Sequence, residues 1–318
     1  MEERAGVGLP LGPEDRDRPQ MDPPNVLWFA GTYATVAAVY VLLSTLPGSH
    51  RGVWVFVVAI AFVVGFAAES WYLLTRRWWV PGGLAAVVAV AMVPAVTVQF
   101  LKLVGVWPEN LGNPFTHFSG WTFAVAVVTA LAGLVAFALT RFSFVFAVVV
   151  GSILVGSGIL ASAPASAGGE DRARAALIAG ALLVIVGIFL DAFGRRRDAF
   201  WFHALGWLSV AGGLAFFTVE PGNPERGWVP MLIIGVLMLI VAGPIGRATW
   251  ALYGVLGYYA PIVHYLLEEL NESRWPFALL LLAVAVSIFL LGMLLYRYGR
   301  TWSQRFVRRP PPDVAVPP

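Results

Sequence analysis

The chain alternates between long apolar runs and short polar or charged connections. Each apolar run is close to the ~20 residues that a helix needs to cross the ~30 Å hydrocarbon core of a bilayer. The runs cover residues 26–46, 52–74, 82–107, 120–140, 142–161, 173–193, 199–219, 228–245, 248–268 and 276–297. This pattern predicts an all-α fold, a polytopic integral membrane helix bundle with about ten transmembrane helices.

Two of the predicted helices have distinctive ends. The fourth and fifth meet at Thr140 and Arg141 with almost no loop, so a tight hairpin is expected there. The eighth is the shortest and is bracketed by Pro230 and Pro244. Because proline is tolerated in a first helical turn and disrupts a helix interior, we expect these two prolines to begin and end that helix.

The composition excludes a water-soluble domain. Of the 318 residues 59% are hydrophobic and 12% are charged, with a mean hydropathy of +0.77. A soluble domain carries roughly 25% charged residues. The chain has no cysteine, which excludes disulfides, thiolate metal sites and cysteine nucleophiles. The preference for arginine over lysine, with abundant Ala, Val, Gly and Pro, suggests a bacterial origin and hence the bacterial cytoplasmic membrane.

The distribution of arginine predicts the threading, because cytoplasmic loops are enriched in basic residues. With a cytoplasmic N-terminus, fifteen arginines fall in inner segments and five in outer loops, and both ends of the chain are cytoplasmic. The arginines are distributed between the apolar runs and form no single patch, which argues against nucleic-acid binding. The five outer arginines are Arg51, Arg172, Arg174, Arg226 and Arg274.

The ends of the chain differ from its middle. Residues 1–25 combine both charges with several prolines and predict a disordered tail. Residues 26–298 form the transmembrane domain, which can be divided into halves at 26–161 and 173–298. Residues 299–318 are basic and Pro-rich. Their arginines either face anionic headgroups of the inner leaflet or follow a frayed helix end; they include Arg300, Arg305, Arg308 and Arg309.

The ninth segment holds the densest set of polar and special-backbone residues. Their spacing of three and four places them on one helix stripe. One hypothesis is a polar cavity in which His264 and Glu268 bind a cation or relay protons beside a bend at Pro261. The alternative is a packing face notched by Gly254 and Gly257, with two polar residues at the water boundary. The stripe comprises Arg247, Trp250, Gly254, Gly257, Pro261, His264 and Glu268.

Segment three contributes a second polar pair after Pro94. Gln99 and Lys102 share one helix face, and Lys102 is the one lysine of the chain. Lys102 either extends to the headgroups or pairs with an acid at the same depth, for which Glu268 and Glu269 are the candidates.

Three further residues near the inner side are candidates. Asp191 precedes Arg195 by four positions, which predicts a local ion pair. Glu69 could serve as a gate or form a buried pair. His203 begins a stripe with Gly206 and Gly213 that favours close helix packing over a site. We find no motif for catalysis, no set of metal ligands and no cofactor motif.

The last two segments resemble part of a known family. An acidic turn with Asn271, Glu272 and Ser273 precedes Trp275-Pro276-Phe277, and the final helix ends in Leu295-Tyr296-Arg297. This sequence pattern resembles the C-terminal part of an uncharacterised family of bacterial polytopic membrane proteins, known as a domain of unknown function. The resemblance covers about a fifth of the chain. It implies a multi-pass membrane protein and no particular activity.

The sequence leaves two candidate functions for this protein. The first is a non-enzymatic membrane protein, structural or regulatory. The second is a secondary transporter of a small solute or ion, because ten spans could divide into five plus five inverted helices. An in-plane two-fold axis relating the halves would favour the transporter.

Overall fold

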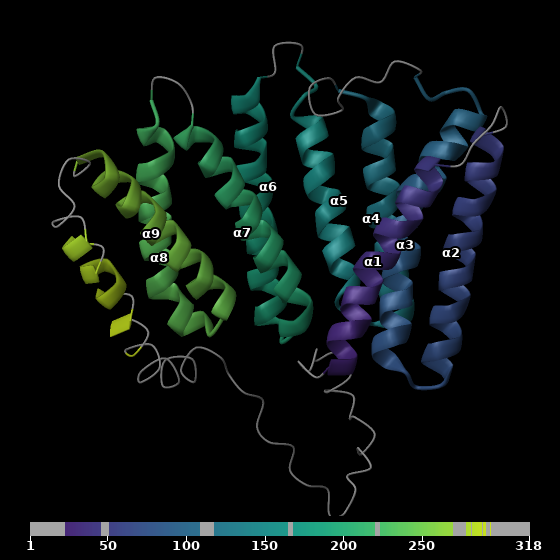
Figure 1. The fold of residues 1–318 in the computed structure, drawn as a ribbon, viewed down its shortest axis with the longest axis horizontal. Helices are drawn as coiled ribbons and strands as arrows, with labels where there is room; N and C mark the ends of the chain where they lie inside the picture. Colours follow the sequence, from purple (N-terminus) through teal and green to yellow (C-terminus); the bar gives the residue numbers. More distant parts are fainter. Residues whose placement is uncertain are drawn as a thin grey trace, which may run out of the picture. The chain divides into compact units, whose positions relative to one another are not determined.

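The computed structural model describes residues 23–45, 51–108, 118–164, 168–219 and 223–269, and in the last predicted segment 278–280, 282–287, 289–290 and 293. Over these residues the fold is helical and contains no strand (Figure 1). The helices are α1 (Pro23–Thr45), α2 (Arg51–Thr75), α3 (Trp79–Leu103), α4 (Gly120–Thr140), α5 (Val145–Leu160), α6 (Gly169–Ala192), α7 (Arg196–Thr218), α8 (Glu225–Ile245) and α9 (Ala248–Glu269).

Each of these helices overlaps one of the first nine predicted segments, so the all-helical prediction is confirmed for the described residues. The tenth segment, 276–297, falls only partly within them, and its described residues are helical. α1 already begins at Pro23, three residues inside the predicted N-terminal tail. The rest of that tail and the tail 299–318, with Arg300, Arg305, Arg308 and Arg309, lie outside the described residues.

Seven of the described helices are long and apolar enough to cross a membrane: α1, α2, α3, α4, α6, α7 and α8. α5 has 16 residues, or about 24 Å of helix, which is shorter than the ~30 Å core. α9 has 22 residues, but its tyrosines, His264 and Glu268 lower its hydropathy. The fold is therefore compatible with a membrane helix bundle. The count of ten spans stays a prediction.

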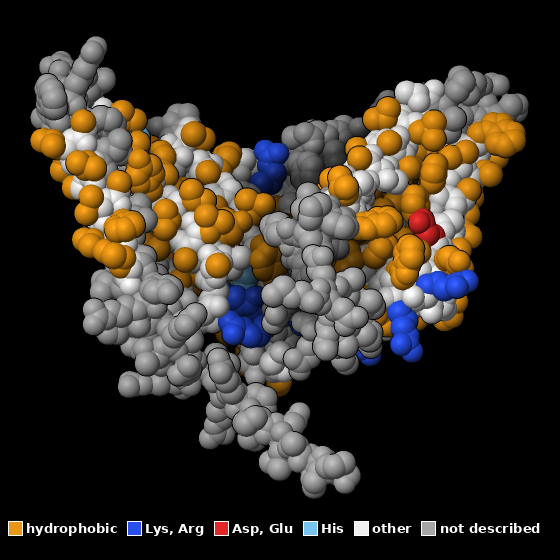
Figure 2. Space-filling view, turned by 60° about the horizontal axis from the view of Figure 1, so that its bottom comes forward, with side chains coloured by type: hydrophobic (Ala, Val, Ile, Leu, Met, Phe, Trp, Pro, Cys, Tyr) orange, Lys and Arg blue, Asp and Glu red, His pale blue; other side chains and the backbone are white. Residues whose placement is uncertain are grey.

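The outward faces of the helices are apolar, as expected for contact with lipid. α6 shows this most clearly, because Ile178, Leu182, Ile185 and Phe189 recur at spacings of three and four and are all exposed. On the face drawn in Figure 2, hydrophobic side chains cover much of the described surface. Water-soluble monomers rarely expose continuous apolar patches larger than a few hundred Å².

The chain divides into two compact units. Unit 1 contains residues up to Gly168 together with Arg195–Phe202, and unit 2 contains Gly169–Gly194 and the residues from His203 onward. The boundary near residue 168 falls between the predicted halves 26–161 and 173–298. The first two turns of α7 do not follow this division along the chain, because they belong to unit 1 together with α1–α5.

Unit 1 is built around α3, which packs against α1, α2, α4 and α5. Nearly every residue from Gly82 to Met92 is buried. Gly83 allows Phe142 to approach closely, because a Cβ at Gly83 would lie 2.3 Å from the Phe142 ring. The predicted hairpin between α4 and α5 is confirmed: Arg141 adopts the left-handed conformation with φ 55°, and the Thr140 hydroxyl accepts a hydrogen bond from Phe142 N.

Unit 2 contains α6, most of α7, α8 and α9. Gly180 of α6 meets Gly206 of α7, where a Cβ on Gly180 would lie 2.6 Å from the Gly206 carbonyl oxygen. Gly235 of α8 meets Gly257 of α9 in a similar way. Such glycine contacts let helix backbones approach closely. The prediction that Gly206, Gly213, Gly254 and Gly257 are packing positions is confirmed.

The predicted ends of the eighth helix are wrong. Pro230 and Pro244 both lie inside α8, which begins at Glu225 and is longer than α5. The helix instead ends at Gly246, which adopts the left-handed conformation with φ 66° and donates its N–H to the Ala242 carbonyl. Glycine at this position is the usual helix stop because it lacks a Cβ.

Candidate functional site

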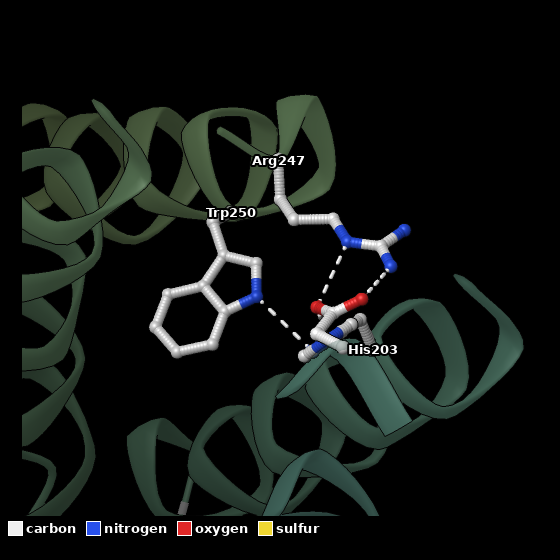
Figure 3. Close-up of polar contacts among 4 residues, drawn as sticks. His203, Arg247 and Trp250 are labelled. Carbon is white, nitrogen blue, oxygen red and sulfur yellow. Dashed lines mark hydrogen bonds and ion pairs between the residues drawn. The ribbon is translucent and has the colours of Figure 1, made fainter. Parts of the chain in front are cut away.

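Four polar side chains gather at one end of unit 2. Asp191 lies in the last turn of α6, and His203 lies on α7. Arg247 immediately precedes α9, and Trp250 lies in its first turn. Figure 3 shows the side chains of His203, Arg247 and Trp250 converging, with the hydrogen bonds that join this set. We call these four residues the polar cluster.

Asp191 is the centre of the polar cluster. Its Oδ2 accepts from Arg247 Nε at 3.1 Å, and its Oδ1 pairs with Nη2 of the same guanidinium. Oδ2 also lies 2.9 Å from His203 Nε2. Both carboxylate oxygens are therefore occupied. The two-point contact with Arg247 matches the planar fork of a guanidinium, which makes such a pair stronger and more directional than a single hydrogen bond.

His203 is fully enclosed, with 0% of its side chain exposed. Its Nδ1 accepts a hydrogen bond from the Trp250 indole N–H at 3.1 Å, and its Nε2 faces Asp191. An indole N–H can only donate, so Nδ1 must carry the lone pair and Nε2 the hydrogen. The hydrogen-bond network thus selects the neutral tautomer protonated at Nε2.

Glycine and aromatic residues hold the polar cluster in place. A Cβ on Gly187 would lie 3.0 Å from the His203 ring, so glycine makes room for the imidazole. Trp207 packs edge-on against Trp250 with ring centroids 5.0 Å apart. The Tyr253 hydroxyl donates to the Ala204 carbonyl at 3.0 Å and adds a second link between α9 and α7. These contacts join α6, α7 and α9.

The predicted ion pair between Asp191 and Arg195 is wrong. α6 ends at Ala192, and Gly194 turns the chain with φ 78°, so the two residues are not on one helix face. Arg195 instead pairs with Asp198 in unit 1, with Nε and Oδ2 2.7 Å apart. Asp198 also accepts a hydrogen bond from Ser143 at 2.6 Å.

His203 packs at a close helix contact, as predicted, and also forms hydrogen bonds that were not predicted. The stripe that it begins does pack closely through Gly206 and Gly213. The expectation that His203 itself is only part of a packing notch is incomplete, because it bridges Asp191 and Trp250. Of the inner-side candidates, the structure brings Asp191 and His203 together. Glu69 is exposed on α2, so the interpretation of Glu69 as a buried pair is wrong.

His264 and Glu268 lie together as predicted, with Nε2 and Oε1 3.3 Å apart. His264 also stacks on Trp228 of α8, with ring centroids 4.2 Å apart. Next to it, the Tyr265 hydroxyl donates to Glu225 at 2.5 Å. Glu268 is largely exposed, so this pair lies at the surface of the end of α9.

The remaining predicted residues of α9 serve packing. Pro261 is fully buried, and a Cβ on Gly257 would lie 3.1 Å from Gly235 Cα. Among the described residues, no three His, Asp or Glu side chains are grouped so that they could hold a metal ion.

Gln99 and Lys102 line one cavity of unit 1, which agrees with their placement on one face of α3. The cavity has a volume of about 590 Å³ and is also lined by Tyr40 and Ser44 of α1. Lys102 is exposed. Its pairing with Glu268 or Glu269 would join two units that are described separately, and it stays a prediction.

A second cavity, of about 640 Å³, lies within unit 2 next to the polar cluster. α6, α7, α8 and α9 all contribute to its walls, and Trp250 belongs both to the wall and to the polar cluster. No pattern in the sequence predicts this cavity.

Comparisons with known proteins give no relative. No protein-family model matches the chain, and neither the curated proteins nor the solved structures contain a significant match. The resemblance of the last two segments to a family of uncharacterised membrane proteins stays a prediction.

Proposed function

We propose that the chain is a non-enzymatic, multi-pass protein of the bacterial cytoplasmic membrane, with about ten spans and both ends in the cytoplasm. In this proposal it has a structural or regulatory role, and unit 2 is a fixed scaffold. Support for the membrane location comes from seven long apolar helices and their exposed apolar faces.

The scaffold role rests on one observation, which is that the polar atoms of the polar cluster bond to one another. Both oxygens of Asp191 and both nitrogens of His203 are engaged within it. These contacts tie α6 and α7 to the start of α9, as expected of a structural crosslink. Asp191 and Arg247 are 17% and 10% exposed, so breaking the pair leaves a partly buried charge. Such a loss costs about 3–5 kcal/mol.

The test compares stability with transport in the same variants. Asp191→Asn is expected to lower the unfolding midpoint of the detergent-solubilised full chain, while wild-type proteoliposomes show no proton or cation flux above empty vesicles. Glu69→Gln, which neutralises an exposed acid of α2, is the matched control and should not lower the midpoint. A wild-type flux that Asp191→Asn abolishes without a change in midpoint would contradict the scaffold role.

A second candidate function is a secondary transporter, favoured by the ionisable residues of the polar cluster. Asp191 and His203 lie within helices long and apolar enough to span a membrane, and ionisable residues at such positions often mark ion pathways. The His264–Glu268 pair is the other candidate. Unchanged flux in both His264→Ala and Glu268→Gln would end the proposal for that pair.

Threading is tested separately. Reporter fusions at the two ends of the chain should both be active on the cytoplasmic face. Ends on opposite faces would require an odd number of crossings and would refute the proposed topology.

A further inference from the structure

The unit 2 cavity has the form of a groove that follows the helix axes. Its lining on α6 extends from Arg174 to Ile185, a rise of about 16 Å. This length is close to half of the ~30 Å hydrocarbon core, which is the depth of the acyl chains in one leaflet. The volume of about 640 Å³ lies within the range of small-molecule sites.

Nearly all of the groove is apolar. α7 contributes Val210, Leu214 and Phe217 to its wall, and α8 contributes Pro230 and Ile234. Such a wall favours a hydrocarbon chain, because burial of apolar surface is favourable by roughly 25 cal/mol per Å².

The charged residues of the lining are both arginines and both lie at one end. Arg174 is in the second turn of α6, and Arg226 is the second residue of α8. Phe217, next to the last residue of α7, lies at the same end, with the Arg226 guanidinium 5.5 Å from its ring centroid. Trp207 and Trp250 line the opposite end of the groove.

The two arginines share a single carboxylate oxygen. Arg174 Nη2 lies 2.6 Å and Arg226 Nη2 lies 2.7 Å from Glu170 Oε1. These three side chains together carry a charge of +1. Both guanidiniums are also about half exposed, so an anion can reach them. Paired guanidiniums bind phosphate oxygens through charge-assisted hydrogen bonds.

We propose that the groove binds one anionic phospholipid, with an acyl chain along α6 and α7 and the phosphate on Arg174 and Arg226. The apolar wall, the length of one leaflet and the arginine pair at one end together fit an amphiphile with an anionic head. Phosphatidylglycerol meets these requirements. The inference rests on the membrane location in the proposed function, but it holds for a scaffold or a transporter.

The test measures lipid retention by the full chain in detergent, using native mass spectrometry after incubation with phosphatidylglycerol or phosphatidylcholine. Wild type is expected to retain one phosphatidylglycerol and to bind phosphatidylcholine at least tenfold more weakly. The double variant Arg174→Gln, Arg226→Gln should lose about tenfold or more in phosphatidylglycerol affinity, because it removes charged hydrogen bonds. The double variant Arg76→Gln, Arg77→Gln removes the same charge from unit 1 and should bind as wild type.

A second pair of variants tests the groove itself. Ala181 lines the groove and is exposed, so Ala181→Trp fills the groove without disturbing buried residues. It should abolish retention of phosphatidylglycerol. Leu182→Trp, at the neighbouring exposed position outside the lining, should retain the lipid.

The proposal is overturned if the arginine double variant or Ala181→Trp retains phosphatidylglycerol as wild type does. It is also overturned if inorganic phosphate competes fully, because the site would then recognise a free anion and not a lipid. Lipid retention is read in detergent and does not depend on flux or threading. Its failure is therefore distinguishable from failure of the proposed function.

Discussion

The indole N–H of Trp250 donates to Nδ1 of His203 across 3.1 Å and so determines which imidazole nitrogen carries the hydrogen. That hydrogen, on Nε2, faces Asp191. One contact from α9 thus orients a residue of α7 towards an acid of α6. The four residues of the polar cluster act together, and loss of one member is expected to affect the others.

Trp250→Phe should destabilise the full chain by roughly 1–2 kcal/mol, because His203 Nδ1 loses its donor while it stays buried. Chemical unfolding in detergent measures this change. Trp54→Phe, at an exposed position of α2, is the matched control. Combined with His203→Leu, the effect of Trp250→Phe should shrink, since the acceptor is then absent. Full additivity of the two substitutions would contradict the proposed coupling.

Arg247→Lys should lower the unfolding midpoint even though the charge is kept. A lysine ammonium cannot reproduce the two-point contact that the guanidinium makes with Asp191. We expect a loss smaller than the about 3–5 kcal/mol expected for Asp191→Asn. Arg77→Lys, at an exposed position just after α2, should have no measurable effect. A midpoint for Arg247→Lys equal to wild type would show that charge alone maintains the pair.

Gly235→Ala should loosen the contact between α8 and α9. The added Cβ would lie 2.5 Å from both the Gly257 carbonyl carbon and Tyr258 N, and neither backbone atom can rotate away. Overpacking of this kind costs about 1–3 kcal/mol. Gly65→Ala is the same substitution where no atom lies within 4 Å, and it should stabilise α2 by up to about 1 kcal/mol. Equal unfolding midpoints for the two variants would refute the close contact.

Glu170→Gln should increase retention of phosphatidylglycerol. The substitution removes the negative charge that Arg174 and Arg226 share, so both guanidiniums attract a phosphate more strongly. The same lipid-retention measurement applies. Glu69→Gln should not change retention. Weaker retention by Glu170→Gln would mean that Glu170 is needed to position the arginines.

The positions of the helices could be predicted from the sequence because hydropathy varies sharply along the chain. Helix ends were harder where two signals competed. Pro230 and Pro244 suggested the limits of α8, but both are accommodated inside it, and Gly246 provides the stop. The glycine contacts were predictable as a class, because glycines at helical spacing mark close approach. The residues that each glycine contacts could not be predicted, because they depend on which helices become neighbours in the fold.

The polar cluster could not be predicted because its members are far apart in sequence. Asp191 is 12 positions from His203 and 56 from Arg247. The local rule for residues four apart favoured Arg195, and it failed because Gly194 ends the helical path. The sequence holds two signals that point to the polar cluster. Asp191 is an acid at the end of an apolar helix, and Arg247 directly precedes a helix that contains a tryptophan.

The enclosed position of α3 has a consequence for biosynthesis. The ribosome completes α3 before α4 and α5, which form part of its final surroundings. In the proposed membrane location, lipid occupies those sides of α3 first and leaves when the later helices arrive. The small residues between Gly82 and Ala89 give lipid little side-chain surface to hold, so the exchange favours helix contact. A chain that ends before α4 would leave those sides of α3 in contact with lipid.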